Sequence, residues 1–210
     1  PEEDFYEAVT EYVRRIYNRS SMLNKPVVGF AMALMQKRLV SSIGAIKATL
    51  ERRLEGLLEE DMVELTQEAR SYLEGEDLEE DDQIAAQQEL ERVTVAGDAA
   101  LHEELEALRH LLDMAEEIPV DSKAQKVRRY IQQLLEEQPD EKLLLFTEYT
   151  DTLNYLLELV KDEPWADEIL VIDGSVDKDE RARIAEEFHQ GQSRPLFSTD
   201  AASASIALYH

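Results

Sequence analysis

Small hydroxyl side chains follow three short apolar runs in the C-terminal part of this chain. They are Thr147 after Leu143–Phe146, Ser175 after Ile169–Ile172, and Ser198 with Thr199 after Leu196–Phe197. Hydroxyl groups suit phosphate oxygens, above all beside a helix N-terminus, where backbone N–H groups also point outward. The pattern therefore indicates a phosphate-binding set of Thr147, Ser175, Ser198 and Thr199. The ordinary alternative is that polar residues mark the places where the chain turns after a strand.

The elements that must position these hydroxyls are strands and helices in alternation. Each apolar run is too short for a helix and is apolar on both faces, which is typical of parallel strands covered on both sides. The segments between the runs have helical spacing, and Asp177 with Glu180 predicts a helix from Lys178 to about Gln190, stopped by Gly191. The order strand–helix–strand–helix–strand predicts βαβ units of an α/β fold. The carboxyl ends of such strands share one rim, where ligands bind.

The N-terminal part has the periodicity of helices instead. Apolar stripes predict helices over 4–17, over a long pattern from Phe30 to Leu57 broken at its glycines, and over 61–73, 84–95 and 98–117. Ile118-Pro119 ends the last of them, and Asp121 or Ser122 caps the next helix. We therefore expect a helical region over residues 1–118 and an α/β region over 119–210.

Charge divides the chain unevenly. The net charge is −25, and residues 51–118 alone hold 23 acidic residues against five Lys and Arg, so this section repels phosphate. The acidic connector at 74–82 and its flanking helices predict an acidic hairpin, about 59–118, that projects from the body. If this hairpin has a function, it is a protein-docking arm or a mimic of DNA. The alternative is an ordinary solvated helical surface. The N-terminal part is more basic, and its cations suit a DNA-facing rim or charges around a core stripe equally well. They are Arg14, Arg15, Arg19, Lys37, Arg38, Lys47, Arg52 and Arg53.

The sequence lacks the residues that several classes of function require. The chain has no cysteine, no glycine-rich phosphate loop and no His, Ser and Asp set for a hydrolase, and its four histidines are scattered. No run approaches the roughly 18 apolar residues of a membrane span, and Pro1-Glu-Glu-Asp4 is no signal peptide. We expect a cytoplasmic protein without membrane contact, and a piece of a longer protein, because the chain does not begin with Met.

Three runs, taken in order, resemble the second RecA-like lobe of superfamily 2 helicases, particularly the Swi/Snf-type DNA translocases. Lys142–Tyr149 is similar to motif IV, Asp173-Gly-Ser with Arg181 and Phe188 to the signature that follows it, and Ser198–Ser203 to the start of motif V. Leu34–Arg38 is similar, more loosely, to the helical segment that joins the two lobes. The resemblance implies an incomplete RecA-like lobe (αβα) after a mostly helical linker region.

The resemblance also implies roles. Thr147, Thr199 and Ser175 would contact the backbone of double-stranded DNA, whereas Arg181, Asp200 and Ser205 would face the nucleotide or couple it to DNA. ATP and Mg²⁺ would bind between this lobe and a first lobe that the chain lacks. No cofactor is expected on the chain alone, and no ATPase activity. Ala204–Ala207 replaces the Gly-containing end of motif V, which leaves a non-catalytic relative as a further alternative.

Overall fold

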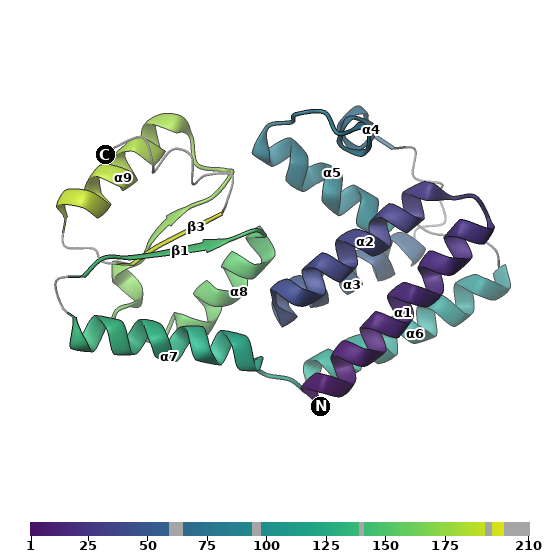
Figure 1. The fold of residues 1–210 in the computed structure, drawn as a ribbon, viewed down its shortest axis with the longest axis horizontal. Helices are drawn as coiled ribbons and strands as arrows, with labels where there is room; N and C mark the ends of the chain where they lie inside the picture. The colour runs from purple at the N-terminus through teal and green to yellow at the C-terminus, as the bar shows by residue number, and fades with distance from the viewer. Residues whose placement is uncertain (59–64, 94–97, 139–140, 192–194, 200–210) are drawn as a thin grey trace. The chain divides into compact units, whose positions relative to one another are not determined.

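The computed structural model describes residues 1–58, 65–93, 98–138, 141–191 and 195–199 (Figure 1). Backbone contacts divide the chain into two compact units, Pro1–Pro119 and Val120–His210. The first unit holds α1 (Glu2–Met22), α2 (Pro26–Ser41), α3 (Ile43–Leu58), α4 (Gln67–Glu74), α5 (Glu80–Arg92) and α6 (Asp98–Glu116). The second holds α7 (Ser122–Glu137), β1 (Leu143–Thr147), α8 (Thr150–Val160), the 3₁₀ turn η1 (Ala166–Glu168), β2 (Leu170–Ile172), α9 (Lys178–Gln190) and β3 (Pro195–Thr199).

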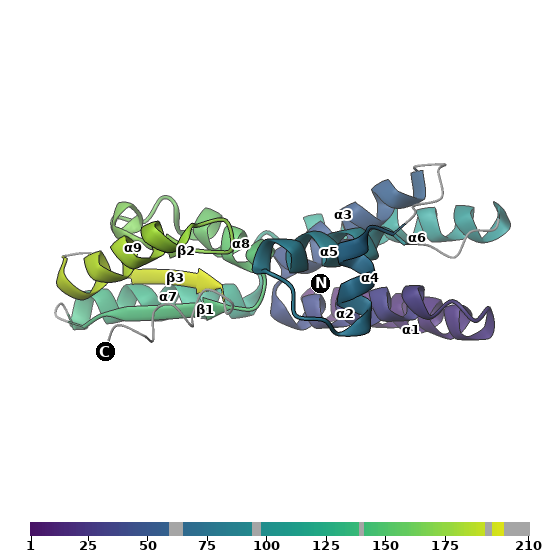
Figure 2. The same ribbon diagram turned by 90° about the horizontal axis from the view of Figure 1, so that it is seen from above.

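Helices alone make up the described part of the first unit. Figure 2 shows α1 and α2 on one side of this unit and α3 and α6 on the other, and α1 also packs against α6. The apolar stripes predicted from the sequence line the core: Phe5, Val9 and Ile16 of α1 are buried, as are Met35 of α2 and Leu50 of α3. The long pattern from Phe30 to Leu57 is broken at Ser42, rather than at a glycine. Its backbone is extended, and its hydroxyl accepts a hydrogen bond from the Ala45 N–H at the start of α3.

The acidic segment does not project from the first unit, which corrects the prediction of an extended arm. Helices α4 and α5 pack against each other, but α5 also packs against α2 and α3, and α6 packs against α3 and α1. The apolar sides of these helices explain the packing, because Ala69, Ala86 and Leu90 form one buried cluster with Leu34 of α2. The acidic helices are therefore part of the body of this unit. Their exposed carboxylates lie both on the α4–α5 connector and on the solvent-facing sides of the helices, as with Glu106 and Asp113 of α6.

Two buried carboxylates join the acidic helices to the basic ones. Glu104 of α6 accepts hydrogen bonds from Arg53 of α3 (Nη2–Oε1 2.6 Å) and from the Tyr12 hydroxyl of α1 (2.8 Å). Glu91 of α5 accepts from Arg38 of α2 (3.1 Å) and from Arg52 of α3 (2.6 Å). Arg53, Glu91 and Glu104 are at most 2% exposed. Arg38, Arg52 and Arg53 thus bind carboxylates inside the helical unit and do not form a DNA-facing rim, whereas Arg14, Arg15 and Lys37 are exposed. Glu91 and Glu104 are not surface charge.

The second unit is built on a three-stranded parallel sheet with the strand order β1-β3-β2. The three strands are those that the apolar runs predict, and α9 begins and ends as the Asp177 and Gly191 signals predict. The Asp177 carboxylate accepts from the N–H groups of Asp179 and Glu180, and Asp121 caps α7 through the Ala124 N–H (2.6 Å). The predicted fold class, a partial α/β lobe behind a helical region, is confirmed.

Helices cover both faces of this sheet, as Figure 1 shows with α9 on one side of the strands and α7 and α8 on the other. Leu143, Leu145 and Phe197 pack against apolar residues of α7 and α8. Leu196 and Ile172 point to the opposite face, where Phe188 of α9 packs on them. The sandwich fixes the direction of each strand and therefore brings the carboxyl ends of all three to one rim.

Candidate nucleic-acid interface

Thr147 and Thr199 are the last residues of two neighbouring strands. They are partners in the parallel register of β1 and β3, so their side chains lie side by side and point to the face that α7 and α8 cover. Thr147 is 9% exposed and Thr199 is 2% exposed. The Thr147 hydroxyl donates to the backbone carbonyl of Tyr149 (3.2 Å). Its proton is therefore engaged within the chain, and a phosphate contact through this hydroxyl requires that bond to open.

Ser175 lies at the same rim but in a loop, beyond the end of β2. Its hydroxyl and its N–H both donate to the Asp173 carboxylate, at 2.7 and 3.0 Å. The side chain is exposed, but the carboxylate beside it would repel an approaching phosphate. The structure thus brings Thr147 and Thr199 together as a pair and places Ser175 next to a negative charge.

Arg181 holds this loop in place. From the first turns of α9 its guanidinium donates to the carbonyl oxygens of Val176 (2.6 Å), Asp173 (3.0 Å) and Gly174 (2.9 Å). Three hydrogen bonds from one cation to backbone fix the loop strongly. This geometry agrees with a role in stabilising the lobe; the role that the family resemblance implies, facing the nucleotide, stays a prediction.

Two of the predicted site residues, Asp200 and Ser205, lie outside the described residues. Thr150, at the first position of α8, is not among the predicted site residues. Its Oγ1 is buried and has no hydrogen-bond partner in the described part of the chain, and α8 starts without a side-chain cap. Burying a hydroxyl without a hydrogen-bond partner costs free energy. This hydroxyl can still donate and accept, so it is a further polar group close in sequence to Thr147.

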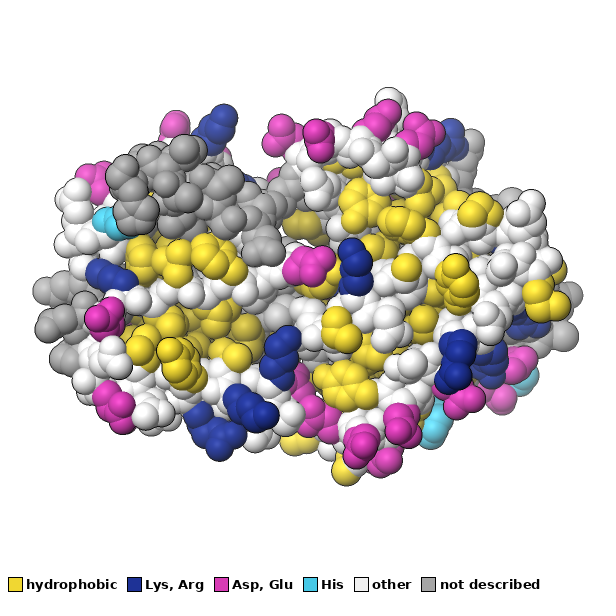
Figure 3. Space-filling view, in the orientation of Figure 1, with side chains coloured by type: hydrophobic (Ala, Val, Ile, Leu, Met, Phe, Trp, Pro, Cys, Tyr) yellow, Lys and Arg dark blue, Asp and Glu magenta, His cyan; other side chains and the backbone are white. Residues whose placement is uncertain are grey.

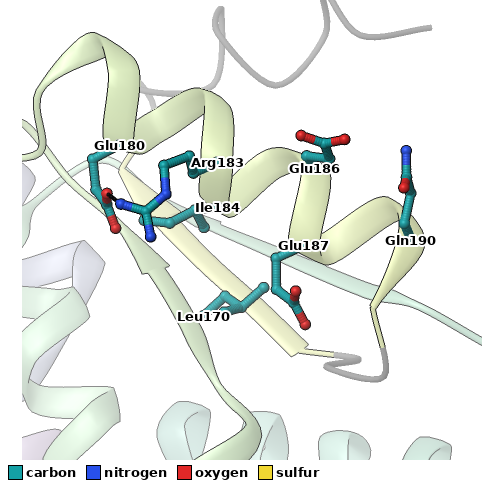
Figure 4. A pocket seen from close by; sticks show the side chains of 7 residues that line it. All are labelled: Leu170, Glu180, Arg183, Ile184, Glu186, Glu187 and Gln190. Atoms are coloured by element: carbon teal, nitrogen blue, oxygen red, sulfur yellow. Dashed lines mark hydrogen bonds and ion pairs between the residues drawn. The ribbon is translucent and has the colours of Figure 1, made fainter.

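A shallow groove of about 490 Å³ runs along α9 beside β2. Figure 4 shows Glu180 and Arg183 facing each other, with Leu170 and Ile184 nearby and Glu186, Glu187 and Gln190 further along the helix. Three carboxylates against one guanidinium make this groove negative, and its surroundings disfavour phosphate groups. The groove is therefore a poor nucleotide or nucleic-acid site.

The described residues contain neither a metal cluster nor a membrane-spanning helix. Within the described ranges, no three His, Asp or Glu side chains come together in a way that could hold a metal ion. None of the helices seen there is long and apolar enough to cross a membrane. The phosphate site at the rim of the sheet stays a prediction.

Comparison with known proteins gives a family match for the second unit. Residues 124–210 match the family described as helicase conserved C-terminal domain. The match, together with the parallel sheet, supports the C-terminal lobe of a superfamily 1 or 2 helicase in this part of the chain. No curated protein and no solved structure matches the chain.

Proposed function

We propose that the chain is part of an ATP-dependent DNA helicase or translocase of the Swi/Snf type, comprising a helical linker region and an incomplete second motor lobe. The observation that carries the proposal is the pairing of Thr147 with Thr199 at the carboxyl ends of adjacent parallel strands, inside the segment that matches a helicase domain. In this proposal the strand-end residues contact the DNA backbone, which needs no base reading and suits a motor that moves along any sequence.

ATP and Mg²⁺ would bind between this lobe and a first lobe that supplies the phosphate loop and its lysine. The sequence contains no such loop. The proposal therefore expects no steady-state ATP turnover from the 210-residue chain, with or without DNA. Turnover that persists through repeated purification steps would contradict the division of the machinery between two lobes.

The DNA contact is tested by mapping backbone amide resonances of the chain during titration with a short duplex at low salt. We expect shifts at Thr147, Ser175 and Thr199 and around the start of α8, and weaker duplex binding by the variant Thr147→Val/Thr199→Val, which keeps the side-chain shape. Thr10→Val is the matched control, because its hydroxyl bonds only to the Tyr6 carbonyl of the same helix. Unchanged resonances at the rim would contradict the proposal.

A second candidate function, a protein-docking module, rests on the α4–α5 connector. Glu79 at the end of this connector and Asp81 and Asp82 in the first turn of α5 are exposed, and Figure 3 shows acidic side chains gathered along the α4–α5 part of the surface. Reversing these three charges to Lys would weaken binding to a basic peptide more than reversal of Glu106 and Asp113 on α6 and Glu117 just after it. Equal effects of the two variants would identify the connector as ordinary acidic surface.

A further inference from the structure

Helix α7 carries an unusual distribution of charge for this chain. In a protein with a net charge of −25, the first half of α7 holds Lys123, Lys126, Arg128 and Arg129, and after the N-cap Asp121 the next acidic residue is Glu136. Figure 3 shows Lys and Arg side chains gathered over the part of the surface that α7 occupies in Figure 1. The helix therefore presents a positive surface within a strongly negative molecule.

This order of charges runs against the stability of the helix itself. The N-terminal end of a helix favours carboxylates and its C-terminal end favours cations. In α7 the cations stand in the first turns, and Glu136 and Glu137 stand at the end. By comparison, α9 has Asp179 and Glu180 in its first turn and His189 in its last. Helix stability does not explain the cations of α7, so a binding role becomes the better explanation.

Three of the cations share one face. Ala124, Ile131 and Leu135 are buried in the core of the lobe, and helical geometry places Lys126 and Arg129 on the opposite side, with Lys123 and Tyr130 next to them. Arg128 lies on the other flank, where it pairs with Glu163. The Gln132 and Gln133 side chains donate hydrogen bonds to Glu136 and Glu137, one turn further along the helix. We call Lys123, Lys126, Arg129 and Tyr130 the basic face of α7.

We propose that the basic face of α7 binds the phosphate backbone of nucleic acid, as a second contact beside the rim of the sheet. This inference rests on the proposed function and adds to it a surface that the strand-end residues do not include. Lys123 and Arg129 are separated by about 9 Å along the helix axis. That length matches about two to three successive phosphates of one strand, at about 3.4 Å of axial rise each.

Tyr130 favours nucleic acid over an acidic protein segment as the occupant. Its side chain is 63% exposed and lies beside the cations of the same face. Basic residues with an exposed aromatic ring among them are the composition of surfaces that follow a nucleic-acid strand, where the ring packs on sugar or base. A solvated helix face or a simple counterion surface has no need of the ring.

The test compares two variants of the 210-residue chain that change the net charge equally. The first is Lys123→Gln/Lys126→Gln/Arg129→Gln. The control is Lys161→Gln/Lys178→Gln/Arg183→Gln, whose three cations are exposed elsewhere in the same unit. Binding of a fluorescent duplex of about 20 base pairs is measured by anisotropy over a series of salt concentrations. We expect the α7 variant to bind at least about tenfold more weakly at low salt, with a salt slope smaller by about two to three, and the control to change little.

Equal weakening in the two variants would overturn the inference, since net charge alone would then explain it. Polyglutamate as a probe decides between classes of partner: if it shifts the α7 amides as strongly as DNA at equal charge, nucleic acid is not the preferred occupant. Should the triple variant fail to fold, Lys126→Gln alone replaces it, with an expected slope change of about one.

Amide mapping separates this inference from the proposed function. Shifts at the strand ends without shifts in α7 would contradict nucleic-acid binding by the basic face and leave the motor-lobe proposal intact. Shifts in α7 without shifts at Thr147 and Thr199 would support the basic face and count against the strand-end contact.

Discussion

Arg53 and Glu104 show how much one buried ion pair contributes in the first unit. Replacing Glu104 with Ala leaves a fully buried guanidinium without its carboxylate, and we expect a loss of about 3–5 kcal/mol in the free energy of unfolding. The measurement is the urea midpoint followed by circular dichroism. Glu103→Ala is the control, because its pair with Arg15 is solvent-exposed and contributes less than about 1 kcal/mol. A double replacement by Met at position 53 and Leu at position 104 should cost less than Glu104→Ala alone.

Tyr12 adds a dependence on alkaline pH to the same cluster. Burial raises the pKa of its phenol well above the ordinary value of 10.0, and the Glu104 charge raises it further, whereas Arg53 opposes both. The folded chain therefore holds this proton to higher pH than the unfolded chain does. Stability from this group is fully present below about pH 10 and falls as pH rises through the pKa of the folded state.

We expect the unfolding free energy of the wild type to fall more steeply than that of Tyr12→Phe as the pH rises above about 10, by up to about 1.4 kcal/mol per pH unit. Urea titrations at each pH measure both slopes. Parallel slopes would show that the Tyr12 proton does not contribute.

At the level of elements, Gly56 permits a close crossing of α3 with the end of α5. A Cβ at this position would lie 2.6 Å from the Arg92 carbonyl oxygen and 2.9 Å from its Cα. Replacing Gly with Ala inside a helix normally stabilises the helix. Here the added methyl group would displace the Arg92 backbone. That backbone leads to the Val93 carbonyl, which accepts a hydrogen bond from Arg53 (2.8 Å). We expect Gly56→Ala to destabilise the chain by about 1–3 kcal/mol.

The expected loss of stability is tested by comparing the melting temperatures of the Gly56→Ala and Gly29→Ala variants. At Gly29 the nearest atoms to a new Cβ are the Ser20 hydroxyl at 3.3 Å and the Tyr17 ring at 3.5 Å, which are side chains that can move slightly. A melting temperature of Gly56→Ala at or above that of Gly29→Ala would contradict the close crossing.

The elements themselves were largely predictable from the sequence, and their partners were not. Apolar runs and caps are local signals, so the strands and the ends of α9 follow from residues such as Asp177 and Gly191. The partners of the buried arginines lie more than 50 residues away, as in the pairs Arg38–Glu91 and Arg53–Glu104. Periodicity shows which face of a helix is buried but not which charge it meets there. The acidic segment was therefore expected to be surface throughout.

The rim of the sheet shows the same limit. The position of Thr147 and Thr199 at strand ends follows from local sequence, because parallel strands end at one edge. The bond of Thr147 to the Tyr149 carbonyl and that of Ser175 to Asp173 depend on loop conformations, which the sequence alone does not specify. These internal bonds are the features that decide how easily the rim can take a phosphate.

At the scale of the whole molecule, charge differs between the two units. Residues 1–119 hold 28 acidic residues and 12 Lys and Arg, whereas residues 120–210 hold 19 and ten. A phosphate backbone near the second unit is thus repelled by a first unit that is tethered to it by a short connection at Pro119. This repulsion acts over about a Debye length and weakens as salt is added.

The two-unit division predicts that residues 120–210 alone bind duplex DNA more tightly than the whole chain at low salt. We expect a gain of several-fold near 20 mM salt, and little difference above about 300 mM, because screening then removes the contribution of the first unit. Circular dichroism first establishes that residues 120–210 keep their helices, and anisotropy then compares the two affinities across the salt series. An isolated second unit that is folded but binds no better at low salt would show that the acidic unit does not limit DNA binding. Repulsion of phosphate would then not explain the negative charge of α4–α6. The docking role of the α4–α5 connector would become the stronger hypothesis.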